Sequence, residues 1–164
     1  KPIIAAINGP AMGAGLAFAL ACDRRFADPS ARMCAAMVRL GFSPDCGVTW
    51  LLPRVTNLST ALMMVETGCI LDANQCLKYG LVDELTEDGK AYEAAMEYAK
   101  RLAQGPSVAV DIARRCVYKA ANGATLEEIL DYEAVAGTIT ANTADAAEGT
   151  KSFVEKRKPV FKGC

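Results

Sequence analysis

The chain has 164 residues and a formal net charge of −1, with 52% apolar and 23% charged residues. This composition can fill one domain-sized core and excludes a disordered chain. The small net charge gives no general attraction to nucleic acid or to an anionic membrane, and no apolar run reaches the ~18 residues of a membrane span. The absence of histidine excludes Ser-His-Asp and Cys-His catalysis, and we expect no metal site.

The seven cysteines lie singly among apolar residues and form no Cys-x-x-Cys pair. This pattern favours reduced, buried thiols over a disulfide framework. We therefore expect a reducing compartment, the cytoplasm first, with a mitochondrial or peroxisomal matrix as alternatives.

The first half of the chain alternates short apolar runs with turns and helices. Residues 3–7 predict a buried strand that ends at Asn8-Gly9, and residues 16–22 predict a helix after further glycines. Because the chain begins inside this strand, we expect that an N-terminal portion of the protein precedes it. Three more short strands are expected at 26–27, 33–35 and 81–85, and three short helices at 45–54, 59–67 and 73–79.

The second half is predicted to be helical. Apolar residues in 91–102 recur at helical spacing, Gly105-Pro106 ends that helix, and Ser107 is expected to cap the next one. Two further helix starts are indicated by capping-box spacing, which pairs Thr125 with Glu128 and Asp145 with Glu148.

The first candidate site is the run Gly9 to Gly15, which contains Gly13 and lies between a strand and a helix. Closely spaced glycines let a backbone approach a ligand, and free amides at a helix N-terminus favour negative charge. Such a turn could hold a phosphate or stabilise an oxyanion, although it has neither the Walker nor the dinucleotide spacing. The alternative is a tight strand-to-helix turn without a ligand.

The second candidate is Asp45, which follows Pro44 and precedes an apolar helix. Its carboxylate could cap that helix, or it could be a general base whose pKa is set by burial in an apolar pocket. Cys46 is disfavoured as a nucleophile because no histidine is present to activate it.

The third candidate is the segment 151–162, which contains five of the 18 basic residues. Such a run is usually a solvated helix face. Phe153 and Lys156, three residues apart, would instead present an aromatic ring and an ammonium group on one face, a pair that suits an adenine nucleotide.

These segments, in this order, resemble the enoyl-CoA hydratase/isomerase (crotonase) superfamily. Residues 1–9, Gly13-Ala14-Gly15 and Cys22-Asp23 look like the family's central strand, oxyanion loop and following helix. The later matches are Gly80-Leu81-Val82-Asp83, Glu148-Gly149 and 153–159. The resemblance covers the C-terminal two-thirds of the family fold.

The resemblance implies an α/β crotonase-like fold with a repeated ββα spiral core. Residues 1–88 would form the last part of that core and carry the catalytic segment. Residues 89–164 would form a helical region that binds coenzyme A and builds homotrimers, often paired into hexamers. The implied partner is an acyl-CoA thioester, with no nucleic acid and no membrane.

The resemblance also implies roles for single residues. Hydratases of the family use two glutamates, and the matching positions here are Ala17 and Met37. Asp45, in Pro-Asp-Cys-Gly-Val-Thr-Trp, matches the proton-shuttling aspartate of ring-epoxide isomerases of phenylacetate metabolism and of Δ3,Δ2-enoyl-CoA isomerases. The Ala14 N–H would be one oxyanion donor, and a loop upstream of Lys1 would supply the other.

The remaining implied contacts concern the substrate. Gly13, Gly15 and Met37 would lie against the acyl thioester, whereas Phe153 and Lys156 would contact the nucleotide of coenzyme A. The implied activity is an acyl-CoA isomerase that needs no metal and no cofactor other than the coenzyme A of its substrate. A hydratase or another lyase, and a non-catalytic acyl-CoA-binding subunit, are the alternatives.

Overall fold

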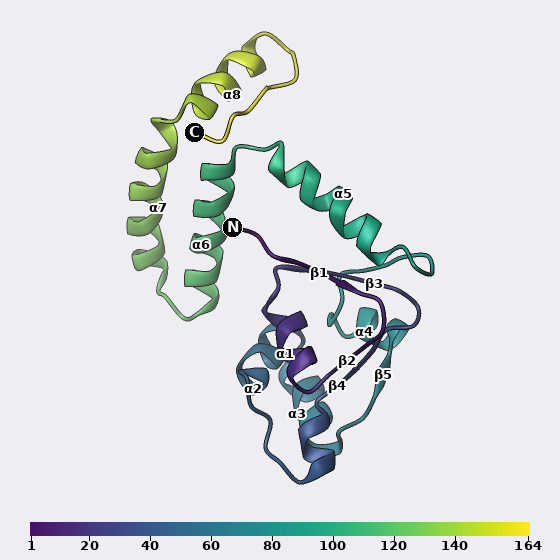
Figure 1. The fold of residues 1–164 in the computed structure, drawn as a ribbon. Helices are drawn as coiled ribbons and strands as arrows, with labels where there is room; N and C mark the ends of the chain where they lie inside the picture. Colours follow the sequence, from purple (N-terminus) through teal and green to yellow (C-terminus); the bar gives the residue numbers. More distant parts are fainter. The chain divides into compact units, whose positions relative to one another are not determined.

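A computed structural model describes residues 1–164, which separate into two compact units (Figure 1). The first unit, Pro2–Glu97, contains every strand, and the second, Tyr98–Cys164 together with Lys1, is helical. The expected order of an α/β half followed by a helical half is therefore confirmed. The functional division predicted between residues 88 and 89 stays a prediction. None of the helices is long and apolar enough to cross a membrane.

A parallel three-stranded sheet contains the predicted first strand. Its order is β1 (Ile4–Ile7), β3 (Arg24–Ala27) and β6 (Glu84–Leu85), and all neighbours run parallel. The last strand is shorter than predicted because the chain at Leu81 and Val82, although buried, bonds back to the carbonyl of Cys76 instead of to a strand.

A second small sheet has the order β2 (Pro10–Met12), β4 (Arg32–Cys34) and β5 (Leu71–Asp72). β2 pairs parallel with β4, and β4 pairs antiparallel with β5. The sequence did not predict β2, which lies within the glycine-rich run. Pro10 is tolerated there because it begins an edge strand, where a missing N–H costs no ladder bond.

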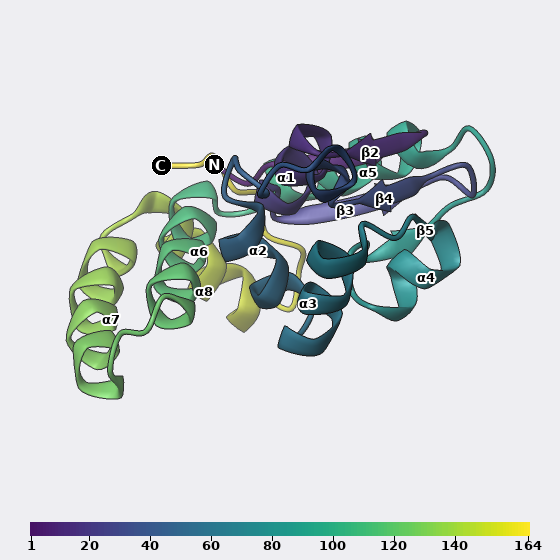
Figure 2. The same ribbon diagram turned by 90° about the horizontal axis from the view of Figure 1, so that it is seen from below.

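Short helices cover these strands, and three of their side chains, Leu16, Leu52 and Met64, are completely buried. Figure 2 shows α4 against β4 and β5, and α2 beside α3. α1 also packs against α2. The helices are α1 (Ala14–Ala21), the 3-10 helix η1 (Ala36–Leu40), α2 (Val48–Val55), α3 (Leu58–Thr67) and α4 (Ala73–Lys78). The sequence predicted all of them except η1.

The beginning of α5 (Ala91–Ala103) is fixed by a residue far away in sequence. Asp28, only 3% exposed, accepts a 2.8 Å hydrogen bond from the Ala91 N–H and another of 2.8 Å from the Thr86 hydroxyl. These bonds lower the pKa of Asp28 even though burial opposes its ionisation. A buried carboxylate at the end of β3 thus caps the helix.

The helical unit contains α6 (Ser107–Ala121), α7 (Leu126–Ala141) and α8 (Ala144–Val154). Figure 1 shows α6 and α7 side by side. Residues of both helices, most of them apolar, line a groove of about 500 Å³. The capping box of Thr125 and Glu128 is confirmed, because each side chain accepts a hydrogen bond from the other's backbone N–H.

Two predicted caps are wrong. Ser107 lies inside α6, whose N-cap is Pro106, and its hydroxyl donates to the Gly163 carbonyl instead. Asp145 lies inside α8, whose N-cap is Thr143, because Thr143 has the extended backbone of a cap and accepts from the Ala146 N–H at 3.1 Å.

Candidate functional site

The glycine-rich turn places unbonded amides at the start of α1. Gly13, at φ +57°, is the N-cap, and its N–H donates to the Cys34 carbonyl at the end of β4, 3.1 Å away. The first intrahelical bond runs from the Ala17 N–H to the Gly13 carbonyl at 3.2 Å. The N–H groups of Ala14 and Gly15 therefore have no acceptor within the chain, and Ala14 is exposed.

Apolar side chains border this turn. The Met37 sulfur lies 3.6 Å from the point where a Cβ of Gly13 would stand. Ala17, one helical turn after Gly13, is 3% exposed. The structure thus brings together the predicted Gly13, Ala14, Gly15 and Met37. Neither a methionine nor an alanine side chain can transfer a proton, so Met37 and Ala17 cannot perform acid–base chemistry.

Asp45 lies at the first position of a tight turn that leads into α2. Its carbonyl accepts from the Val48 N–H at 3.0 Å, while Cys46 and Gly47 have φ of +51° and +80°. Two consecutive residues with positive φ define a type I′ turn.

The expectation that Asp45 caps α2 is wrong, because Gly47 is the N-cap and no side chain bonds to that helix end. The expectation of burial is also wrong, since Asp45 is exposed in this chain. Its carboxylate is instead free of the helix backbone. Since α2 packs against α1, neighbouring helices carry the aspartate turn and the glycine-rich turn.

Cys46 is exposed and lies beside this carboxylate. A hydrogen bond to Asp45, together with its negative charge, raises the pKa of the Cys46 thiol. A raised pKa keeps the sulfur protonated at neutral pH and lowers its nucleophilicity. The structure therefore favours the carboxylate over the thiol as the reactive group of this turn.

Phe153 and Lys156 do not share a helix face, contrary to the prediction. α8 ends at Val154, and Lys156 lies beyond the end in the left-handed conformation, at φ +54°. Its N–H bonds to the Phe153 carbonyl at 3.2 Å, and the Arg157 N–H bonds to the Ser152 carbonyl at 3.1 Å. These two bonds form a Schellman motif. Phe153 is 85% exposed, and the turn keeps the two backbones adjacent.

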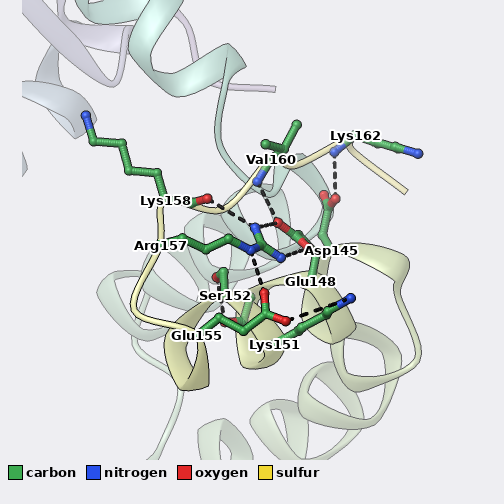
Figure 3. Close-up of polar contacts among 10 residues, drawn as sticks. Asp145, Glu148, Lys151, Ser152, Glu155, Arg157, Lys158, Val160 and Lys162 are labelled. Atoms are coloured by element: carbon green, nitrogen blue, oxygen red, sulfur yellow. Dashed lines mark hydrogen bonds and ion pairs between the residues drawn. The ribbon is translucent and has the colours of Figure 1, made fainter.

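The sequence analysis missed an ion pair behind this turn. Glu148 accepts two hydrogen bonds from the Arg157 guanidinium, of 2.6 and 2.9 Å, and a third of 2.9 Å from the Val160 N–H (Figure 3). The Arg157 guanidinium is the main cause that lowers the pKa of Glu148 to about 2. Helical periodicity could not reveal this pair, because its members are joined across the turn that ends α8.

The glycine-rich turn leaves free amides at an exposed helix N-terminus, a place that favours negative charge. Residues 1–164 match enoyl-CoA hydratase/isomerase throughout, and the chain belongs to that family.

Individual relatives carry both activities in their names. The chain is 36% identical over 163 residues to 1,2-epoxyphenylacetyl-CoA isomerase of Escherichia coli, covering 99% of this chain and 62% of the relative. It is 34% identical over 163 residues to (E)-benzylidenesuccinyl-CoA hydratase of Thauera aromatica, with 99% and 63% covered. The chain therefore spans somewhat less than two thirds of the curated relatives it matches.

Solved structures confirm the fold. The enoyl-CoA hydratase of Bacillus anthracis superposes with a TM-score of 0.94 at 34% identity, covering all of this chain and 63% of that one. The expected crotonase-like α/β fold is confirmed by this similarity and by the family match.

Proposed function

We propose that the chain carries the catalytic segment of an acyl-CoA isomerase that moves a carbon–carbon double bond. The observation that carries the proposal is the pairing of two features. The free amides at the start of α1 are bordered by Met37 and Ala17, which cannot move protons, and the turn before the neighbouring α2 carries the exposed carboxylate of Asp45. One binding element and one proton carrier suffice for an isomerase.

The proposed reaction proceeds through an enolate. The Ala14 N–H donates to the thioester carbonyl oxygen and stabilises the negative charge that develops there. The Asp45 carboxylate removes a proton from one carbon, and the electrons of that C–H bond move into the enolate. The carboxylic acid then returns the proton two carbons away as the charge leaves the oxygen. Because no water is added, no second carboxylate is required, and the step uses no metal or redox cofactor.

The test is Asp45→Asn in the complete protein. Asparagine has nearly the same shape but cannot accept the proton, so we expect the rate of converting 3-enoyl-CoA to 2-enoyl-CoA to fall by at least ~10²-fold. Folding should not change, since the Asp45 side chain caps no helix. The matched control is Asp88→Asn, at an exposed aspartate outside the site. Unchanged turnover in Asp45→Asn would refute the mechanism.

The amide of Ala14 can be tested separately because of its position. Ala14 is the first residue of α1, where proline is best tolerated and removes only an N–H that bonds nothing within the chain. We expect Ala14→Pro to lose ~10²-fold in kcat, and Ala14→Gly to keep most activity. Circular dichroism checks the fold. If Ala14→Pro folds and stays active, the Ala14 N–H is not the oxyanion donor.

The second candidate function is hydration of a 2-enoyl-CoA, favoured by relatives named hydratases. That reaction would require a proton-transfer group besides Asp45, which Ala17 and Met37 cannot provide. The same assay separates the two functions: water addition to 2-enoyl-CoA without isomerisation of 3-enoyl-CoA would support the hydratase.

We also propose that the helical unit binds the nucleotide end of coenzyme A and builds the oligomer. Phe153 and Lys156 would contact the nucleotide from a neighbouring subunit of a homotrimer or of a dimer of trimers. Support for an interface comes from large apolar side chains exposed on α7, which are Leu126, Leu130, Val135 and Ile139. Sedimentation analysis of the complete protein measures the oligomeric state.

A further inference from the structure

The C-terminal segment folds back along α8, and two carboxylates of that helix hold it there (Figure 3). Asp145, only 3% exposed, accepts hydrogen bonds from the N–H groups of Lys162 and Gly163 at 2.7 and 2.9 Å. Glu148 holds Val160 and Arg157. The segment is therefore fixed at several points, both near the end of the helix and near the end of the chain.

Near the end of α8, Arg157 makes most of the hydrogen bonds that hold the C-terminal segment in place. Besides the two bonds to Glu148, its Nε donates to Glu155 at 2.6 Å and its terminal nitrogen donates to the Lys158 carbonyl at 3.2 Å. Each of its three guanidinium nitrogens thus donates to a group of the same chain. A bidentate guanidinium–carboxylate pair is strongly directional, so it fixes the backbone on both sides of the turn.

The hydrogen bonds of Arg157 also determine which basic side chains of this segment lack an ion pair within the chain. Glu148 and Glu155 are both engaged by Arg157. The ammonium groups of Lys156, Lys158 and Lys162 form no ion pair, and Figure 3 shows the Lys158 and Lys162 side chains pointing away from the Glu148–Arg157 pair. In the basic run, Lys151 and Arg157 are therefore ion-paired with Glu155 or Glu148, whereas Lys156, Lys158 and Lys162 are not.

Lys156 occupies a backbone conformation that lysine seldom adopts. Its φ of +54° falls at the position of a Schellman motif where glycine is usual. A side chain other than glycine persists there only where the surroundings over-determine the turn. The residue that follows Lys156 is Arg157, and its two hydrogen bonds to Glu148, here called the clamp, hold the backbone of the turn in this conformation.

We propose that the Glu148–Arg157 pair is a positioning device that holds Lys156 in its left-handed turn beside the exposed Phe153, ready for the nucleotide end of an acyl-CoA. The inference rests on the proposed function for its ligand. Arg157 itself does not touch the nucleotide and is a positioning residue. Because the pKa of Glu148 is lowered from 4.5 to about 2, the clamp stays ionised above pH 4.5 and opens only as the pH falls toward 2.

The test compares two ways of breaking the clamp. In the complete protein, Arg157→Gln and Glu148→Gln are each expected to weaken binding of free coenzyme A, and to raise KM for its thioesters, by ~10-fold, with kcat within ~2-fold. The double variant should bind no more weakly than either single variant, because both remove the same contact. Pantetheine thioesters, which lack the nucleotide, should show no change. Arg115→Gln, which breaks an ion pair on α6, is the matched control.

Arg157→Lys separates positioning from charge, since lysine keeps the charge but lacks the bidentate fork. We expect it to lose several-fold in coenzyme A affinity as well. Loss in Arg157→Gln with full affinity in Glu148→Gln would overturn the inference, because Arg157 would then contact the nucleotide directly. Equal losses for coenzyme A and pantetheine substrates would also overturn it. Wild-type protein that binds no coenzyme A would instead refute the proposed function, and with it the ligand assigned here.

Discussion

The two units of the chain are stabilised in different ways. The large side chains that are completely buried all lie between residues 16 and 82, and they are Leu16, Met33, Cys34, Val48, Leu52, Met64, Cys76, Leu81 and Val82. Within Tyr98–Cys164 the buried apolar residues are only Cys116 and Ala136. Caps, ion pairs and backbone bonds to carboxylates take the place of a core there. The first unit is therefore stabilised by a buried interior, whereas the second has almost none and exposes the large apolar side chains of α7.

The largest effect expected from this difference is on stability. Leu52→Ala removes a completely buried side chain from the first unit and should cost about 3 kcal/mol of unfolding free energy. Leu130→Ala removes the same atoms from α7, where Leu130 is 56% exposed, and should cost less than about 0.5 kcal/mol in dilute protein. Urea unfolding of both variants measures the difference.

Measuring the unfolding free energy of the same two variants at several protein concentrations tests whether α7 lies at an interface between copies of the chain. If copies of the chain associate through α7, the cost of Leu130→Ala should grow with concentration while that of Leu52→Ala stays constant. Equal costs for the two variants in dilute protein would mean that the α7 face is already buried, and would contradict the contrast between the units.

Local signals predicted most of the first unit because its elements depend on local patterns. Short β-branched runs gave β1, and glycines with positive φ ended helices at the predicted places, as Gly68 does after α3. The edge strand β2 escaped prediction since its residues, Pro10 to Met12, lie in a glycine-rich run and pair only with a distant strand.

The candidate site was predicted in its composition more than in its geometry. The family resemblance places Gly13 and Met37 in one site, and in the structure the Met37 sulfur lies 3.6 Å from the point where a Cβ of Gly13 would stand. The left-handed backbone at Cys46 and Lys156 could not be foreseen, because neither residue type prefers positive φ. Because of the positive φ at Cys46, Asp45 lies in a turn before the helix and does not cap it. Because of the positive φ at Lys156, that residue lies beyond the end of α8 and does not share a helix face with Phe153.

The helix starts show the limit of local rules inside one unit. Thr125–Glu128 and Asp145–Glu148 have identical spacing, yet only the first pair forms a capping box. Asp145 and Glu148 instead bind backbone and side-chain groups of the segment 157–163. The spacing of two residues shows that they can form a capping box. It does not show whether groups later in the chain bind the same carboxylates instead.

The smallest effect on the free energy of unfolding is expected from removing one hydroxyl group. The comparison is between a hydroxyl that caps a helix and one that does not. Thr125→Ala removes the hydroxyl that accepts from the Glu128 N–H, so it should cost about 1 kcal/mol. Ser107→Ala deletes the same hydroxyl group at the start of α6, where it caps nothing and makes only a 3.4 Å bond to the Gly163 carbonyl. Its cost should stay below about 0.5 kcal/mol, as for other exposed positions. Urea unfolding of the two variants decides the matter: a Ser107→Ala cost as large as that of Thr125→Ala would show that α6 relies on its serine after all.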